Sequence, residues 1–281
     1  MTIEQALVLG GGGVAGIAWM TGLLAGLADA GHDVTGADLV IGTSAGATVA
    51  AQLGSGLPLD DLYARQVDPA RQSAEIAAQV SLDAFAAEFG EYLQGSSSPQ
   101  DALRAAGAFA LAATTVSEAA RRAVIISRLP SPDWPARTIK LVAVDCETGA
   151  TKVFDSASGV SLVDAVAASC AVPGIWPPVT IGGRRYMDGG VRSSDNADLA
   201  AGAARIVILS PLGVDSPLPT PMPLREVVAS LRDGGAQVTV VSPDDVSRPF
   251  IGTNPLDPAV RAPAAEAGRA QGRAGLPRLP S

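Results

Sequence analysis

The sequence predicts an α/β fold in which helices cover a mostly parallel sheet. Two short apolar strands, residues 6–9 and 38–41, each pass through a glycine-rich turn into a helical stretch. Strands that alternate with helices in this way are typical of parallel sheets, because a helix returns the chain to the edge where the next strand begins. The chain has 281 residues, of which 47% are hydrophobic, and this is enough for a large buried core.

Later segments extend this pattern. Residues 58–128 are rich in helix-forming residues and predict a wholly helical insert. Apolar stretches predict further strands at residues 139–144, 151–154, 184–187, 206–209 and 238–241. We expect a single domain over residues 1–272. The last residues, 273–281, are rich in Gly, Pro and Arg and predict a flexible tail.

The composition of the chain disfavours several classes of binding partner. The formal net charge of −8 argues against nucleic acid, because phosphate binding needs a basic surface. The chain has only two cysteines, without a CxxC or Cys/His cluster, so we expect no disulfide framework and no structural zinc site. We also expect no cofactor. The N-terminus lacks a basic signal-like stretch, and no apolar run is long enough to span a membrane. We therefore expect a cytoplasmic protein whose contact with a membrane surface is transient and apolar.

A candidate nucleophile lies in the second glycine-rich turn. Gly42-Thr43-Ser44-Ala45-Gly46 is a G-x-S-x-G motif between an apolar strand and a helix of small residues. A nucleophilic serine needs a sharp strand-to-helix turn of this kind, and the flanking glycines allow neighbouring chain to pass close by. The motif alone is weak, and a plain tight turn is the alternative.

The first glycine-rich turn is a candidate oxyanion hole. Gly11, Gly12 and Gly13 follow the first strand and precede a helix, so their N–H groups can converge on one point. The same residues match the G-x-G-x-x-G pattern of a dinucleotide site. Such a site needs an acidic residue at the end of the second strand, but this strand ends in Gly-Thr-Ser. A nucleotide or small-ligand site therefore stays the weaker alternative.

The base for Ser44 has to be something other than histidine. The only histidine, His32, precedes Ser44 and lies in a loop expected at the opposite edge of the sheet. Asp188 is the best candidate, because it ends a predicted strand and is followed by Gly189 and Gly190. Partial burial would raise its pKa and make it a better proton acceptor. Taken alone, Asp-Gly-Gly is an ordinary turn.

Together these motifs resemble the patatin-like phospholipase family. A fourth stretch, residues 168–174, is similar to the segment that precedes the family's catalytic aspartate, and the motifs follow the family order over roughly residues 6–200. The resemblance implies a three-layer α/β/α fold with a helical insert, a Ser44–Asp188 dyad and no metal. It also implies a lipid acyl hydrolase of the phospholipase A, lysophospholipase or esterase type. Ala15 departs from the pattern, because many members carry Arg or Lys there.

The predicted mechanism is a two-step acyl transfer. Asp188 takes the Ser44 proton, the glycine loop holds the oxyanion, and water activated by Asp188 releases the acyl group. Two other functions stay open. One is a nucleotide- or small-ligand-binding α/β protein, and the other is an inactive member of the fold that serves as a binding module.

Overall fold

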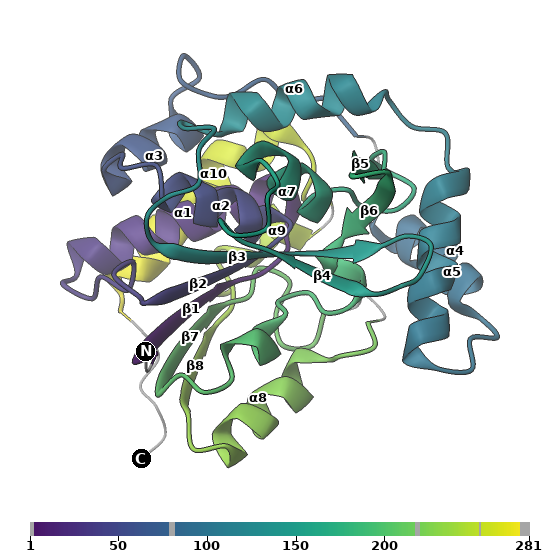
Figure 1. Cartoon of the computed structure of the whole chain (residues 1–281). Coiled ribbons are helices and arrows are strands. Elements are labelled where there is room, and N and C mark those ends of the chain that lie inside the picture. Colours follow the sequence, from purple (N-terminus) through teal and green to yellow (C-terminus); the bar gives the residue numbers. More distant parts are fainter. Residues whose placement is uncertain (1–2, 79–81, 217–219, 253, 276–281) are drawn as a thin grey trace.

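A mixed sheet forms the centre of the molecule in the computed structural model, which describes residues 3–78, 82–216, 220–252 and 254–275 (Figure 1). Its described strands are β1 (Gln5–Leu9), β2 (Leu39–Thr43), β3 (Thr138–Asp145), β4 (Thr151–Phe154), β5 (Val179–Ile181), β6 (Arg184–Asp188), β7 (Arg205–Leu209) and β8 (Gln237–Val241). They lie in the order β5–β6–β3–β2–β1–β7–β8, and β4 pairs with β3.

Five neighbouring strands, in the order β3–β2–β1–β7–β8, are parallel. At the β3 side of the sheet, β4 and β6 pair antiparallel with β3, and β5 pairs antiparallel with β6. After Gln5, β1 is apolar and buried because both of its faces are covered. Leu7 and Leu9 pack into the core on one side of the sheet, whereas Ala6 and Val8 pack into the core on the other. This alternation follows from the two-residue period of a strand.

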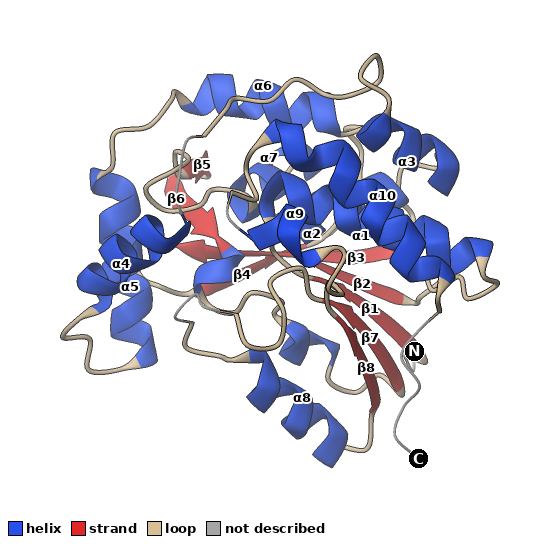
Figure 2. Cartoon of the chain, turned by 180° about the vertical axis from the view of Figure 1, so that it is seen from behind, coloured by secondary structure: helices blue, strands red, loops and turns tan. Residues whose placement is uncertain are grey.

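Helices cover both faces of the sheet (Figures 1 and 2). One layer contains α1 (Gly13–Asp29), α2 (Ala45–Leu53), α3 (Leu59–Val67), α7 (Leu162–Ser169), α9 (Arg248–Gly252) and α10 (Arg261–Arg273). The opposite layer contains α8 (Leu224–Asp233) and the short 3₁₀ helix Ala197–Ala200. The predicted three-layer α/β/α fold with a mostly parallel sheet is therefore confirmed.

The helices α1 and α10 pack with their backbones in contact. A Cβ atom added to Gly22 would lie 2.0 Å from the carbonyl oxygen of Ala265, and one added to Gly268 would lie 2.3 Å from that of Trp19. Gly26 and Gly272, one turn further along each helix, are equally close to the facing backbone. Any larger residue at these positions would push the helices apart.

The prediction that residues 58–128 are wholly helical is wrong for residues 68–78. Besides α3, this part of the chain forms α4 (Leu82–Leu93), α5 (Pro99–Ala112) and α6 (Glu118–Arg128). The chain leaves the helical conformation at Asp68 (φ −87°, ψ 113°) because Pro69 disfavours a helical residue before it. The irregular stretch that follows carries the side chain of Glu75 into the interior.

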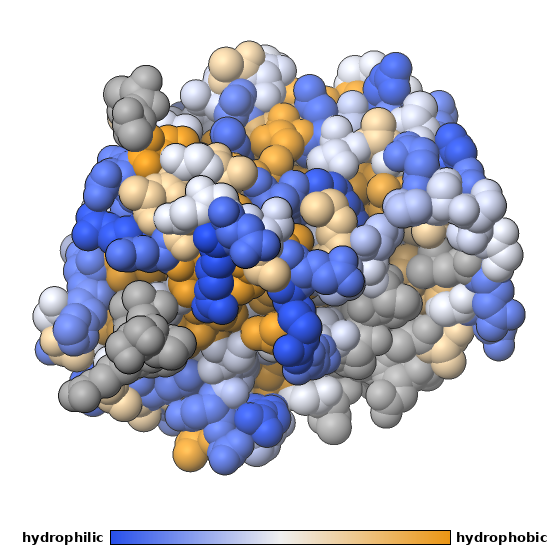
Figure 3. Space-filling model, turned by 90° about the horizontal axis from the view of Figure 1, so that it is seen from below, coloured by the Kyte–Doolittle hydropathy of each residue, from blue (hydrophilic) through white to orange (hydrophobic). Residues whose placement is uncertain are grey.

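Figure 1 shows α4 and α5 side by side at the end of the sheet near β6, with α6 across the top of the α1 layer. Large exposed hydrophobic side chains are scattered over several elements, and on the face seen in Figure 3 apolar patches are separated by hydrophilic residues. Within the described residues, no helix combines the length and apolar character needed to cross a membrane. Most of the expected tail, residues 276–281, lies outside the described part.

Candidate active site

Ser44 occupies the sharp turn between β2 and α2. Its backbone has φ 54° and ψ −113°, a strained conformation that non-glycine residues rarely adopt. Gly46 makes this turn possible, because a Cβ atom there would lie 1.9 Å from the carbonyl oxygen of Leu9. Gly42 is similarly close to the backbone of Gly46. The serine side chain thus stands at the N-terminus of α2, where the helix dipole favours negative charge.

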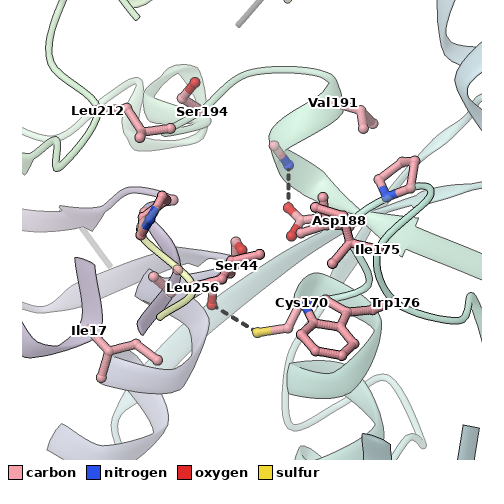
Figure 4. A pocket seen from close by; sticks show the side chains of 18 of the residues that line it. Ile17, Ser44, Cys170, Ile175, Trp176, Asp188, Val191, Ser194, Leu212 and Leu256 are labelled. Atoms are coloured by element: carbon pink, nitrogen blue, oxygen red, sulfur yellow. Dashed lines mark hydrogen bonds between the residues drawn. The ribbon is translucent and has the colours of Figure 1, made fainter. Parts of the chain in front are cut away.

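The register of the sheet brings Asp188 to Ser44. Thr43, the last residue of β2, pairs with Val142 of β3. The antiparallel strand β6 pairs Asp188 with Ala143, the next residue of β3. Ser44 and Asp188 therefore lie at the same level on either side of β3, and Figure 4 shows both side chains at one cavity.

The carboxylate of Asp188 is buried and only partly hydrogen-bonded. Its Oδ1 accepts a bond from the Gly190 N–H at 2.7 Å, whereas its Oδ2 has no hydrogen bond of ordinary geometry with any described residue. Burial raises the pKa of Asp188 to about 7, although the nearby Ser44 hydroxyl, the Gly190 N–H and the Arg121 guanidinium each lower it. A carboxylate with such a pKa can accept a proton near neutral pH.

Gly189 holds the other side of this motif against the sheet. A Cβ atom at Gly189 would lie 2.4 Å from the carbonyl oxygen of Val142. Glycine is therefore needed here for the loop after Asp188 to turn back over β3.

The glycine loop offers fewer free donors than the three expected from the sequence. The Gly11 N–H donates to the Ser194 carbonyl at 2.8 Å, so Gly11 anchors the loop. The N–H groups of Gly12 and Gly13 have no acceptor within the described residues. The same is true of the Ala45 N–H, directly after Ser44. These three donors lie at the N-termini of α1 and α2.

The segment 168–174 touches both Ser44 and Asp188. Ser169 Oγ accepts a bond from the Ser44 N–H at 3.0 Å, and Cys170 Sγ donates to the Ser44 carbonyl at 3.1 Å (Figure 4). The Ala171 carbonyl accepts from the Asp188 N–H at 2.9 Å. This segment therefore fixes the backbone positions of both side chains. The sequence indicated it only through the family resemblance.

Asn196 is a buried residue of the candidate site that the sequence did not reveal. Its buried Nδ2 lies within hydrogen-bond distance of Thr43 Oγ1 (3.1 Å) and of the Gly189 carbonyl (3.1 Å). Its Oδ1 accepts from Arg192 at 2.6 Å. Asn196 thus connects the turn at Ser44 with the loop after Asp188. Its left-handed backbone (φ 50°) suits asparagine, but a single asparagine gives no readable signal in the sequence.

A partly open cavity of about 110 Å³ adjoins Ser44 and Asp188. Its wall is mostly apolar, including the side chains of Ile17, Val172, Ile175, Trp176, Val191, Leu212 and Leu256. Arg121 and Arg128 of α6 also line it. His32 does not, because it follows α1 at the edge of the sheet opposite to Ser44. An apolar cavity beside a candidate nucleophile could hold an acyl chain.

One comparison with known proteins identifies the family. The sequence model of the patatin-like phospholipase family matches residues 7–201, which is more than half of the chain. No curated protein matches the sequence.

Among solved structures, VipD from Legionella pneumophila is similar at 12% identity and a TM-score of 0.47, with 97% of this chain and 66% of VipD covered. The type III effector protein ExoU is similar at 16% identity and a TM-score of 0.38, with 96% of this chain and 53% of ExoU covered. The chain thus spans about two thirds of VipD and half of ExoU. Both TM-scores are below 0.5, so the assignment rests on the sequence match. The chain belongs to the patatin-like phospholipase family.

Proposed function

We propose that this protein is a serine hydrolase that cleaves acyl ester bonds in lipids or lipid-like esters through a Ser44–Asp188 dyad. One observation carries the proposal. A buried carboxylate with a pKa near 7 shares an apolar cavity with a serine held in a strained strand-to-helix turn. Membership of the patatin-like phospholipase family supports a lipid acyl hydrolase.

In the first step, the Ser44 hydroxyl attacks the ester carbonyl carbon while its proton moves to Asp188. The bond from Ser44 Oγ to the carbonyl carbon forms, and the carbonyl oxygen becomes an oxyanion. The free N–H groups of Gly12, Gly13 and Ala45 are the donors available to stabilise it. The ester C–O bond then breaks, and the alcohol leaves with the proton that Asp188 returns.

In the second step, water replaces the alcohol. The water oxygen attacks the acyl-enzyme carbonyl while Asp188 takes a proton from the water. Asp188 then passes this proton to Ser44 Oγ as the carboxylic acid leaves. A different acceptor alcohol in place of water would give acyl transfer with the same residues.

The test is labelling with a fluorophosphonate probe, combined with hydrolysis of short- and long-chain acyl esters. We expect the wild type to be labelled and active, and the Ser44→Ala variant to lose both properties, because the proposed acyl-enzyme forms on the Ser44 hydroxyl. Ser194→Ala is the matched control: it removes another hydroxyl that lines the cavity and should remain labelled.

A folded wild-type protein that does not react with the probe would contradict the proposal. That result would favour the inactive binding module. Ligand binding that is unaffected by Ser44→Ala, without any ester hydrolysis, would favour the nucleotide- or small-ligand-binding protein.

A further inference from the structure

Three arginines and one carboxylate are buried together beside the cavity. Glu75 accepts hydrogen bonds from Arg128 (2.8 and 2.6 Å) and from Arg261 (2.7 Å). These two guanidinium groups occupy both oxygens of the carboxylate. Arg121 Nη1 lies 3.8 Å from Glu75 Oε2, so it forms an ion pair without a hydrogen bond. The cluster therefore has more positive than negative charge.

Arg121 has donors to spare. It is only 5% exposed, yet its buried Nε and Nη1 have no hydrogen-bond partner among the described residues. No ion pair within 4.0 Å joins it to Asp188 in the described structure. Burial and the neighbouring Arg128 lower the pKa of Arg121 to about 10, so it stays charged at neutral pH. A buried cation with unused donors is unfavourable unless a ligand supplies acceptors.

Trp176 holds the guanidinium in place. The Arg121 Cζ atom lies 3.9 Å from the centre of the Trp176 ring, and the tryptophan is itself 4% exposed. A stacking contact of this kind fixes the plane of the guanidinium without using its N–H groups. Both side chains line the cavity that contains Ser44 and Asp188. The stacking therefore pre-orients a charged donor group at the cavity, and such a group can form charge-assisted hydrogen bonds with a carboxylate or phosphate.

We propose that Arg121 forms an anion subsite in this cavity, and that this residue selects acyl esters with a phosphate or carboxylate group over neutral esters. The selection among substrates rests on the proposed hydrolase function, but the subsite itself does not. Arg121 would supply, from α6, the positive charge that Ala15 cannot provide in the glycine loop. Arg128 also lines the cavity, but its bonds to Glu75 leave it less free.

Binding of simple amphiphiles tests the subsite without turnover. Dodecyl phosphate, dodecanoate and dodecanol share an alkyl chain and differ in the head group, and calorimetry would compare their affinities for the Ser44→Ala protein. Charge-assisted hydrogen bonds to a buried arginine should make at least one anion bind about 10- to 100-fold more tightly than the alcohol. A preference for dodecyl phosphate alone identifies a phosphate subsite, and one for dodecanoate a carboxylate subsite.

Two substitutions in the same background assign the effect. Arg121→Met should abolish the preference for the anion, since Met keeps an apolar side chain against Trp176 but has no charge. Arg122→Met is the matched control: Arg122 lies next to Arg121 on α6 but pairs with Asp164 at the surface, so the preference should not change. Equal affinities for anions and alcohol, or an unchanged preference in Arg121→Met, would overturn the proposal.

Arg121→Lys decides the question if the Met variant does not fold. Lysine keeps the charge but has no planar guanidinium to stack on Trp176, so we expect about a tenfold loss of the preference. An unchanged preference in the Lys variant would overturn the proposal that the stacked guanidinium binds the anion.

The two proposals fail in distinguishable ways. If the wild type is not labelled by fluorophosphonate but dodecyl phosphate or dodecanoate binds through Arg121, the hydrolase is wrong and the subsite stands. If the wild type is labelled but no anion depends on Arg121, the subsite is wrong and the hydrolase stands.

Discussion

Asp188 and Asp195 are two buried carboxyl groups with the same electrostatic character but different surroundings. Asp188 is the last residue of β6 and Asp195 lies seven residues further along the chain, and their exposed fractions are 3% and 0%. Burial raises the pKa of each to about 7. A raised pKa is often used to find catalytic residues, and by that criterion the two are equal.

Their contacts separate them. Asp188 lines the cavity beside Ser44, whereas Asp195 does not line it. Asp195 instead packs under the start of the glycine loop, where a Cβ atom added to Gly10 would lie 2.1 Å from its Oδ1, and the Ser210 hydroxyl lowers its pKa. The comparison teaches that a buried carboxyl group becomes a candidate base only where a cavity gives it access to a nucleophile and a substrate.

The largest expected difference between the two residues is in the rate of ester hydrolysis after each is replaced by asparagine. We expect Asp188→Asn to reduce kcat for ester hydrolysis about 10³-fold, because the amide cannot accept the Ser44 proton. Asp195→Asn, the matched control, should retain activity within about tenfold, since Asp195 lies outside the cavity. Measured kcat values of the two folded variants test this, and equal losses would refute the distinction.

In contrast, the two residues should have similar effects on how the free energy of unfolding depends on pH. Each folded-state pKa is raised from 3.8 to about 7, so the folded protein binds more protons than the unfolded chain between these values. Stability associated with each protonated group is therefore present below pH 4 and is lost as the pH rises through 7. A shift of about 3 units corresponds to up to ~4 kcal/mol.

An asparagine does not titrate and should avoid this loss. Relative to the wild type, Asp188→Asn and Asp195→Asn should each become more stable as the pH rises from 4 to 8, because the wild type loses stability over this range. Urea unfolding at pH 4, 6 and 8 measures the change. A difference from the wild type that is independent of pH would show that neither carboxyl group has a raised pKa.

Asn196 should give the smallest effect of the three. Asn196→Ala removes the bonds from Nδ2 to Thr43 and to the Gly189 carbonyl, so we expect about a 10- to 100-fold loss of kcat through misplacement of Ser44 and Asp188. Asn254→Ala is the control: Asn254 bonds to the Ala78 carbonyl (3.4 Å) and accepts from the Leu256 N–H (3.2 Å), but neither bond reaches the turn at Ser44 or the loop after Asp188. Unchanged kcat in folded Asn196→Ala would show that the backbone alone positions the dyad.

Local patterns in the sequence were sufficient to predict much of the fold and the candidate dyad. The G-x-S-x-G turn and the strand that ends at Asp188 depend on neighbouring residues, and so does the strand–turn–helix pattern of β1 and β2. Pro69 is also a local signal for the end of a helix, but the helix-forming residues on both sides of it favoured the wrong prediction of a continuous helical region.

Other features depend on contacts between distant segments, which a single sequence does not encode visibly. The antiparallel direction of β6 determines how Asp188 approaches Ser44, and it follows from pairing with β3. The unused donors of Arg121 depend on Glu75 being saturated by Arg128 and Arg261. The occupied N–H of Gly11 depends on a carbonyl at Ser194.

The glycine contacts between α1 and α10 have a consequence for synthesis of the protein. The ribosome synthesises the chain from the N-terminus to the C-terminus, so Ser44 and Asp188 leave the ribosome well before α10. Until then, α1 has no partner against Gly22 and Gly26, and the Ala15 N–H lacks the Pro255 carbonyl that receives it. The nascent chain therefore carries the candidate nucleophile Ser44 without a fixed glycine loop. We expect the candidate site to be completed only when α10 docks, after nearly the whole described chain has been made.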